Sequence, residues 1–323
     1  MKLLLRKNAE QIQKLTVQIV DLGICRSITM MLSLWGYSRA LIGAVLTVLS
    51  VAAIFILMER PANTRKLQQP DRFTDVTKRT ESPCPVSPIV VVGFGQSNSA
   101  NHLAGPEAAD PQSSGVNFFN GKCYMIEDPV LGASQDRRAP ELRGSLWTRF
   151  AHRLSSSVNK PVLIVSVGVG AFSVDDWLQN KHGALDVLKE QLDELHKKNL
   201  NVDYYIWHQG EADTMFNQDT SATYAARLNR LFDKVAVSAK SANATFLVHL
   251  SSRCREYGPS ERVRLGQQSV IDARDDTVLA LDTDLLDNSF RRDACHFNAR
   301  GTDRIANGLV DRIRELEQAK IAR

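Results

Sequence analysis

Residues 91–98 have the sequence Val-Val-Gly-Phe-Gly-Gln-Ser-Asn, in which an apolar run gives way to two glycines and then to a serine between two amides. The β-branched residues at positions 89–92 predict a strand buried on both faces, as at the centre of a parallel sheet. Glycines directly after such a strand permit a tight turn and let backbone N–H groups approach a ligand, because no Cβ intervenes. Since open α/β sheets bind ligands at strand ends, we predict that Ser97 is a nucleophile; the alternative is a plain turn serine.

Strand-like and helix-like patterns alternate after residue 89. Short apolar runs predict four further strands, at residues 161–169, 203–208, 244–250 and 277–281, and amphipathic periodicity predicts helices at residues 184–198, 224–240, 263–273 and 298–316. Strands separated by helices imply right-handed βαβ crossovers, so we predict an α/β fold with a mainly parallel sheet covered on both faces. Residues 101–142 fit neither pattern, and their Gly, Pro and Asn content predicts a long ordered loop near the ligand.

The N-terminal part of the chain predicts a membrane anchor. Residues 40–58 (ALIGAVLTVLSVAAIFILM) carry no charge and no proline, and at about 1.5 Å per residue they cross a hydrocarbon core of roughly 30 Å. Residues 1–39 hold six basic and two acidic residues, which predicts a cytoplasmic N-terminus and an extracytoplasmic remainder, periplasmic or extracellular. Residues 15–35 are also apolar, but Asp21 and Arg26 favour a cytoplasmic or interfacial segment over a second span.

The predicted organisation has four parts. A cytoplasmic segment (1–39) precedes a single transmembrane helix (40–58), a polar, proline-containing linker (59–88) and one globular domain (89–323). The chain has 40 basic and 36 acidic residues, and beyond residue 39 the two balance at 34 each. The basic excess therefore belongs to the segment before the span and does not indicate nucleic-acid binding.

Four of the five cysteines follow the predicted span, namely Cys84, Cys123, Cys254 and Cys295. An even number in an oxidising compartment predicts two disulfides or plain buried thiols, and three pairings are open. No CxxC pair or His/Cys cluster indicates zinc, so no metal site is expected.

A serine nucleophile needs a base within hydrogen-bond reach, and the base needs an orienting acid. His296 lies in Asp293-Ala294-Cys295-His296-Phe297, between the last predicted strand and the closing helix. Asp293 and His296 are three residues apart on a turn, so the carboxylate can accept from Nδ1–H and leave Nε2 facing a serine. The alternative is that Asp293 caps the turn. Three other histidines are expected at the surface: His152, His182 and His196.

A second polar cluster, Trp-His-Gln-Gly-Glu-Ala-Asp, occupies residues 207–213 at the end of the third predicted strand. Gln209 offers an uncharged N–H suited to a developing oxyanion. Glu211 and Asp213 could form a general acid/base pair or cap the next helix. Their spacing with His208 matches no metal site. A third piece, Gly168-Val169-Gly170-Ala171, offers backbone N–H groups for the same oxyanion.

Three blocks together resemble the ordered sequence blocks of the SGNH hydrolases. They are Gly-Gln-Ser-Asn at residues 95–98, Trp-His-Gln-Gly-Glu-Ala-Asp at residues 207–213 and Asp-Ala-Cys-His-Phe at residues 293–297. More narrowly, they resemble the sialate O-acetylesterase and acetylxylan esterase branch. The resemblance implies a flavodoxin-like three-layer α/β/α domain that hydrolyses acetyl esters on carbohydrate hydroxyls without a cofactor. It extends from about residue 89 to residue 310.

The resemblance also implies roles for individual residues. Ser97 would be the nucleophile, His296 the general base and Asp293 its orienting acid. The oxyanion hole would comprise the Ser97 and Gly170 backbone N–H groups and the Gln209 side chain. Neighbouring side chains expected to contact substrate are Gln96, Asn98, His208 and Glu211.

Two departures distinguish this chain from its relatives. Many relatives have a Gly-Gly pair where Gly170-Ala171 stands, and many use an asparagine where Gln209 is assigned. The serine segment also lacks the second glycine of Gly-x-Ser-x-Gly, which argues against an ordinary α/β-hydrolase elbow. Two alternative functions use the same surface: a carbohydrate O-acetyltransferase with the same triad, and a non-catalytic glycan-binding module.

Overall fold

The computed structural model describes residues 71–239 and 243–321. The predicted cytoplasmic segment, the predicted span at residues 40–58 and linker residues 59–70 lie outside the described residues. Within the described ranges, no helix combines the length and apolar character that a membrane crossing requires.

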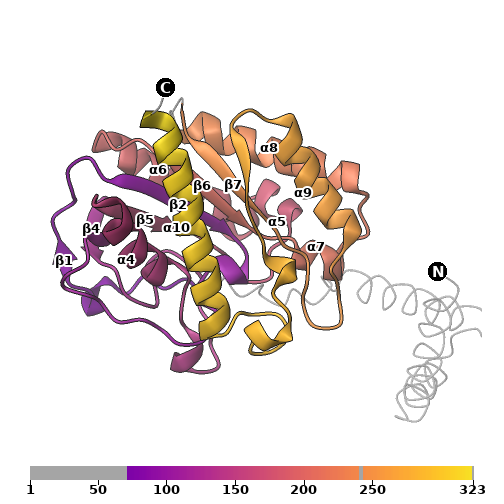
Figure 1. Ribbon diagram of the computed structural model, residues 1–323, viewed down its shortest axis with the longest axis horizontal. Helices are drawn as coiled ribbons and strands as arrows, with labels where there is room; N and C mark the ends of the chain where they lie inside the picture. Colours follow the sequence, from indigo (N-terminus) through magenta and orange to yellow (C-terminus); the bar gives the residue numbers. More distant parts are fainter. Residues whose placement is uncertain (1–70, 240–242, 322–323) are drawn as a thin grey trace, which may run out of the picture. The chain divides into compact units, whose positions relative to one another are not determined.

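Eight strands form one sheet, and all five predicted strands belong to it (Figure 1). In spatial order the strands are β1 (Glu81–Ser82), β4 (Lys122–Met125), β3 (Gly115–Phe119), β5 (Val162–Ser166), β2 (Ile89–Gly95), β6 (Tyr204–His208), β7 (Thr245–Leu250) and β8 (Thr277–Asp282). Six strands that are neighbours in this order run parallel, namely β3, β5, β2, β6, β7 and β8. β4 pairs antiparallel with β3, and β1 pairs antiparallel with β4. The prediction of a mainly parallel sheet is confirmed.

The strand β2 lies at the topological switch point of the sheet. After β2 the chain forms β3 and β4, then adds β5 on one side of β2 and β6 on the other. The resulting order β5-β2-β6-β7-β8 is that of a flavodoxin-like fold. Crossovers leave a crevice at the carboxyl end of the strand where the order reverses. The turn that carries Ser97 follows β2 directly and therefore occupies this position.

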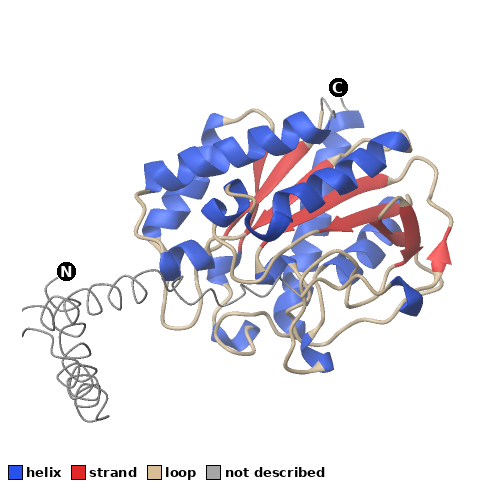
Figure 2. Cartoon of the chain, turned by 180° about the vertical axis from the view of Figure 1, so that it is seen from behind, coloured by secondary structure: helices blue, strands red, loops and turns tan. Residues whose placement is uncertain are grey.

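Helices cover both faces of the sheet (Figure 2). The α-helices are α4 (Trp147–Val158), α5 (Val174–Leu178), α6 (Ala184–Lys197), α7 (Glu211–Phe216), α8 (Ser221–Ala239), α9 (Glu261–Ala273) and α10 (Ala299–Ile321). Short 3₁₀ turns are η1 (Val76–Lys78), η2 (Ser97–Ser99), η3 (Pro140–Leu142), η4 (Lys181–Gly183), η5 (Thr283–Leu285) and η6 (Asn288–Phe290). The core side chains of α4 and α10 pack on one face of the sheet and those of α5, α6, α8 and α9 on the other. The four predicted helices correspond to α6, α8, α9 and α10.

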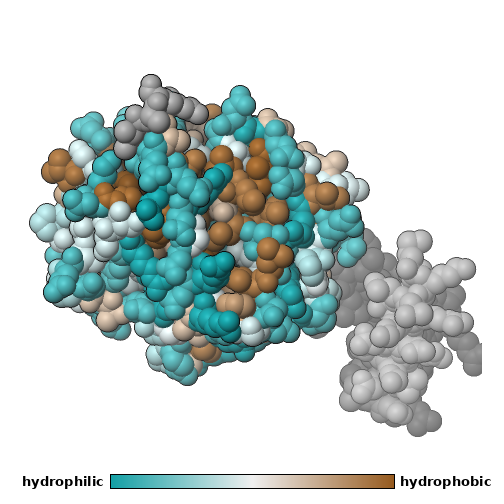
Figure 3. All heavy atoms as spheres, viewed as in Figure 1, coloured by the Kyte–Doolittle hydropathy of each residue, from teal (hydrophilic) through white to brown (hydrophobic). Residues whose placement is uncertain are grey.

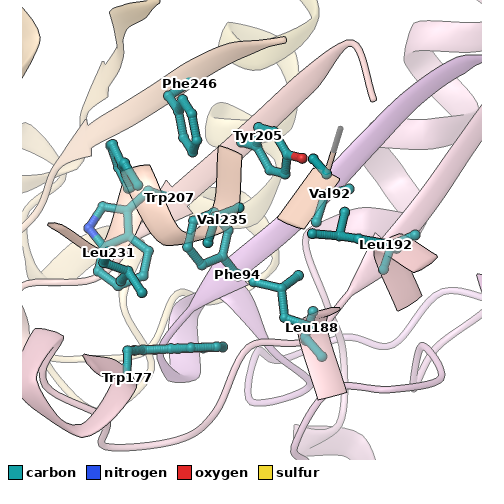
Figure 4. Close-up of a cluster of buried hydrophobic side chains, with 14 of the residues drawn as sticks. Val92, Phe94, Trp177, Leu188, Leu192, Tyr205, Trp207, Leu231, Val235 and Phe246 are labelled. Carbon is teal, nitrogen blue, oxygen red and sulfur yellow. The ribbon is translucent and has the colours of Figure 1, made fainter. Parts of the chain in front are cut away.

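Alternate residues of β2 enter the two halves of the core. Ile89 and Val91 pack toward α4 and α10, while Val90, Val92 and Phe94 face the opposite layer. Figure 4 shows Phe94 among aromatic and aliphatic side chains from neighbouring strands and helices, including Trp177, Leu188, Tyr205, Trp207, Leu231 and Val235. All seven residues of β2 are buried, which is why the segment carries no polar residue before the turn.

The expectation of a long loop at residues 101–142 is wrong in part, because this region contains the hairpin of β3 and β4. Asn120 and Gly121 form its two-residue turn with φ of 49° and 77°, the backbone that an Asn-Gly pair favours. A disulfide joins Cys84 to Cys123 and fastens the segment before β2 to β4. The Asn-Gly pair was the sequence signal that could have identified the hairpin.

The edge strand β8 is only half buried, and α10 covers it incompletely. A groove of about 590 Å³ lies between the two elements, floored by Leu279, Leu281 and Leu286 and edged by charged residues of α10. In Figure 3 apolar side chains gather beside the polar outer surface of α10. This groove lies at the edge of the sheet that β8 forms and not at the switch point.

Candidate active site

The turn after β2 holds Ser97 through backbone geometry that only glycine allows. Gly95 has φ of +134°, and a Cβ there would lie 2.2 Å from the His208 carbonyl oxygen. The next residue, Gln96, donates its backbone N–H to that same oxygen at 3.0 Å. Ser97 then begins the turn η2 with 5% of its surface exposed. Within the described ranges, neither its hydroxyl nor its backbone N–H makes a hydrogen bond, so both are available to a ligand.

The amides on either side of Ser97 point into the protein. The Gln96 side-chain oxygen accepts from the backbone N–H of Ala212 at 3.0 Å, at the start of α7. Asn98 donates its side-chain N–H to Glu211 at 2.7 Å. Gln96 and Asn98 are 1% exposed and Glu211 is fully buried. Together these contacts fasten the serine turn to α7.

His208 is also an interior residue. It is fully buried, and its ring lies 4.4 Å from that of His249. Burial, followed by the neighbouring His249 and Arg291, lowers the pKa of His208 well below its ordinary value, so the ring is neutral. Of the side chains expected to contact substrate, Gln96, Asn98 and Glu211 are buried and support the turn from within, and His208 is buried beside His249.

Asp293 and His296 form the pair that their spacing predicts. One carboxylate oxygen of Asp293 lies 2.8 Å from His296 Nδ1, and the other accepts the backbone N–H of His296 at 2.7 Å. Burial alone would raise the pKa of Asp293, but the hydrogen bond and charge of His296, its backbone N–H and Arg292 together lower it below the usual value. A carboxylate that stays ionised can hold the Nδ1–H tautomer and leave Nε2 as the basic nitrogen.

Several links bring this loop to the serine turn. A disulfide joins Cys295 to Cys254, which follows β7, and the Arg255 backbone N–H donates to the Ala294 carbonyl oxygen at 2.8 Å. On the other side, the Asn98 side chain lies 3.4 Å from the Cys295 carbonyl oxygen. Residues adjacent to Ser97 and to His296 are thus in direct contact. The structure selects the pairings Cys84–Cys123 and Cys254–Cys295 among the three that the sequence left open.

The expected oxyanion donors differ from one another in availability. The Ser97 backbone N–H is unpaired within the described ranges. The Gly170 N–H donates to the Ser134 hydroxyl oxygen at 2.8 Å. Gln209 is fully buried, and its amide nitrogen donates to the Phe172 carbonyl oxygen at 3.1 Å and to Asp213. Both N–H groups of Gln209, the side chain expected to serve in the oxyanion hole, are therefore used internally in this structure.

Asp213 acts as an interior acceptor that joins α7 to the start of α5. Its carboxylate accepts the backbone N–H of Val174 at 3.0 Å, at the start of α5, and the side-chain N–H of Asn217 at 2.7 Å. Burial raises its pKa, while these hydrogen bonds act in the opposite direction. The carboxylate is 0% exposed and does not reach the surface near Ser97.

His102, which the sequence did not indicate, lies against His296, and Ser134, also not indicated, lies beside His102. The His102 ring stacks on the His296 ring, with centroids 5.9 Å apart and planes 20° apart. His102 Nε2 lies 3.0 Å from the Ser134 hydroxyl oxygen. Both residues fall in the region expected to be loop near the ligand, but no pattern in the sequence distinguished them.

Of the histidines expected at the surface, His196 is exposed, whereas His152 and His182 are half buried.

Among the residues that the structure describes, no group of three or more His, Cys, Asp or Glu side chains could hold a metal ion. The described residues offer instead the hydrogen-bonded His296–Asp293 pair, on a loop that contacts the residue next to Ser97, and the Ser97 backbone N–H, which is unpaired within the described ranges. Such an arrangement can accept a proton from a hydroxyl and stabilise negative charge on an oxygen.

Comparison with known proteins gives the class and the family. The family described as "Carbohydrate esterase, sialic acid-specific acetylesterase" matches residues 89–315, which is more than half of the chain. The protein is therefore a carboxylic ester hydrolase of the carbohydrate esterase class. It belongs to the family of sialic acid-specific acetylesterases so described, and the resemblance to SGNH hydrolases is confirmed. A search of curated proteins found no match.

Solved structures are similar to this chain at low sequence identity. A protein from Arabidopsis thaliana is 15% identical with a TM-score of 0.56, and the match covers 70% of this chain and 97% of that one. A carbohydrate acetylesterase from Xanthomonas citri is 17% identical with a TM-score of 0.46, covering 69% of this chain and 55% of that one. A family two carbohydrate esterase from Clostridium thermocellum is 10% identical with a TM-score of 0.46, covering 73% and 66%.

Proposed function

We propose that this protein removes O-acetyl groups from carbohydrate, with sialate as the first substrate class to test, through a triad of Ser97, His296 and Asp293. The observation that carries the proposal is the hydrogen-bonded His296–Asp293 pair on a loop whose Cys295 contacts the residue next to Ser97. The nucleophile comes from the turn after β2, and the base and its orienting acid come together from the loop between η6 and α10, so that separate segments of the chain supply the groups that the chemistry requires.

The reaction proceeds in two acyl transfers. His296 Nε2 takes the Ser97 hydroxyl proton as Oγ attacks the acetyl carbonyl carbon, and the carbonyl oxygen gains the negative charge. Collapse of this intermediate breaks the bond to the sugar oxygen, which leaves with the proton from His296. Water then attacks the acetyl-enzyme in the same way, gives its proton to His296 and releases acetate and the free serine.

Asp293 keeps the base in its working tautomer and stabilises the imidazolium that forms in each transfer. The Ser97 backbone N–H, which is unpaired within the described ranges, is ready to donate to the oxyanion. The Gly170 N–H reaches the oxyanion only after its bond to Ser134 is exchanged. Gln96, Asn98 and Glu211 hold the turn in place from the interior.

We further propose that residues 40–58 tether this domain outside the membrane, with residues 1–39 in the cytoplasm. The two disulfides support an oxidising compartment for the domain, since cytosolic proteins rarely keep such bonds. The uncharged apolar run at residues 40–58 and the basic excess before it support the orientation.

The test compares Ser97→Ala with a matched serine variant, Ser156→Ala, whose serine is exposed on α4. Ser97→Ala should fold normally and lose nearly all release of acetate from O-acetylated sialic acid and from p-nitrophenyl acetate, and it should no longer be labelled by a fluorophosphonate. Ser156→Ala should behave as the parent protein in all three measurements. Full turnover by Ser97→Ala would overturn the triad. Addition of an unacetylated sugar as acceptor tests hydrolysis against transfer.

A further inference from the structure

The oxyanion site has fewer open donors than the sequence predicts. Gln209 directs both amide N–H groups to interior acceptors, and the Gly170 N–H is taken by the Ser134 hydroxyl. Of the three expected donors, all within the described residues, only the Ser97 N–H is unpaired. One donor in an otherwise aligned site is a weak oxyanion hole, because each further donor typically contributes on the order of 10²-fold to turnover.

His102 is placed where a further donor is needed. A Cβ on Gly170 would lie 3.1 Å from His102 Nε2 and 3.2 Å from its Cε1, so this edge of the ring covers Gly170. The face of the ring stacks on His296. The imidazole therefore lies between the base and the glycine turn, the two groups expected on either side of the reacting carbonyl. It is only partly buried.

The Ser134 hydroxyl lies between the Gly170 N–H and one ring nitrogen of His102. The Ser134 oxygen accepts the Gly170 N–H at 2.8 Å and lies 3.0 Å from His102 Nε2. A hydroxyl oxygen can accept two hydrogen bonds as well as donate one, so this contact is compatible with either tautomer of His102. In the tautomer in which the Ser134 hydroxyl donates to Nε2, the ring proton is on Nδ1, which makes no hydrogen bond within the described part of the chain.

The surroundings keep this ring neutral. Burial and then the neighbouring His296 lower the pKa of His102 to about 3; Arg292 and Arg138 act in the same direction, and Asp136 opposes them. His102 is thus uncharged across the range in which an esterase operates. A neutral Nδ1–H can donate to an oxyanion without competing with His296 for the proton of Ser97.

We propose that His102 is a catalytic residue whose Nδ1–H donates to the acyl oxygen as the tetrahedral intermediate forms, in the place that sequence assigns to Gln209. This inference rests on the proposed function, because it requires acyl transfer at Ser97. It adds no covalent step: the hydrogen bond strengthens as the oxygen becomes negative and weakens when the intermediate collapses.

The test uses two substitutions that differ only in the donor. His102→Phe keeps a planar ring to stack on His296 but has no N–H, and His102→Asn places an amide N–H close to the position of Nδ1. Exposed His196 on α6, changed to Phe, is the matched control. Turnover of p-nitrophenyl acetate and of O-acetylated sialic acid is measured over pH, with the thermal midpoint and the fluorophosphonate labelling of Ser97 as checks of folding and site integrity.

His102→Phe should lower kcat on the order of 10²-fold with little change in KM, and His102→Asn should recover most of that loss. The acid limb of the pH profile should not move in either variant, because His102 does not titrate there. Equal losses in Phe and Asn variants, or full activity of His102→Phe, would overturn the inference. If Ser97→Ala also retained activity, the proposed function itself would fail; if Ser97→Ala were inactive while His102→Phe was fully active, only the role of His102 would fail.

Discussion

The two disulfides offer an internal comparison between stability and positioning. Cys84–Cys123 closes a sequence separation of 39 residues, and Cys254–Cys295 closes one of 41. Loop-closure entropy depends on the logarithm of this length, so at 25 °C each bond stabilises the folded chain by about 4 kcal/mol. Replacing either pair by alanine should therefore shift the free energy of unfolding by nearly the same amount.

Activity should separate the two variants. Cys295 precedes His296 and Cys254 holds it to the loop after β7. Cys123 lies on β4 and Cys84 follows the edge strand β1, at the end of the sheet opposite β8. Loosening a base by about 1 Å can cost on the order of 10²-fold in rate. Loss of the Cys254–Cys295 bond should thus lower kcat by roughly ten- to a hundredfold in folded protein, while loss of the other bond should leave kcat close to the parent value.

The assay combines urea unfolding of each double alanine variant with kcat measured well below its unfolding transition. Free-thiol titration of the parent protein confirms that both bonds are formed. Equal losses of stability and equal losses of activity in the two variants would show that the disulfide beside His296 has no positioning effect. Loss of turnover in the Cys84–Cys123 variant alone would contradict the expectation as well.

Three further outcomes follow from the same contacts. Asp293→Asn should lower kcat by roughly 10⁴-fold without unfolding the protein, because an amide can favour the wrong tautomer of His296; an unchanged kcat for p-nitrophenyl acetate would contradict this. The pKa of Asp293 is lowered in the folded state, so the stability that its carboxylate contributes is present above about pH 4 and is lost as the pH falls further. Between about pH 5 and pH 3 the thermal midpoint of the parent protein should therefore drop more than that of Asp293→Asn. Gln209→Met should lower the free energy of unfolding in urea by about 1–3 kcal/mol, because it removes the hydrogen bonds to Phe172 and Asp213. It should change kcat per folded molecule by less than about tenfold. A hundredfold fall in kcat would show that Gln209 does act in the oxyanion hole.

Sequence patterns located the strands and helices well because burial on two faces leaves a continuous apolar run. The segment at residues 89–92 extends to Gly95 as β2, and the four later strands and four helices appear at or within a few residues of their predicted bounds. The hairpin of β3 and β4 was missed, although Asn120-Gly121 is a strong local signal for it. Helix α4 was missed too.

Candidate site residues were predicted less evenly. The pair Asp293 and His296 was identified correctly as a hydrogen-bonded unit, because residues three apart on a turn interact locally. Gln209 and Glu211 were expected to face the ligand because they follow a strand at the ligand-binding edge. Their side chains instead point inward, where each satisfies a buried partner that comes from a distant part of the chain.

Local composition and ordered short blocks were enough to establish the parallel sheet, the serine at its central strand end, the family and the apolar run before the domain. Three features emerged only in the folded chain: the disulfide pairing, the inward direction of Gln96, Asn98, Gln209 and Glu211, and the stacking of His102 on His296. The physical reason is that side-chain direction at a strand end depends on which loops from elsewhere in the chain pack against it. Those contacts join residues far apart in sequence, and no local pattern records them.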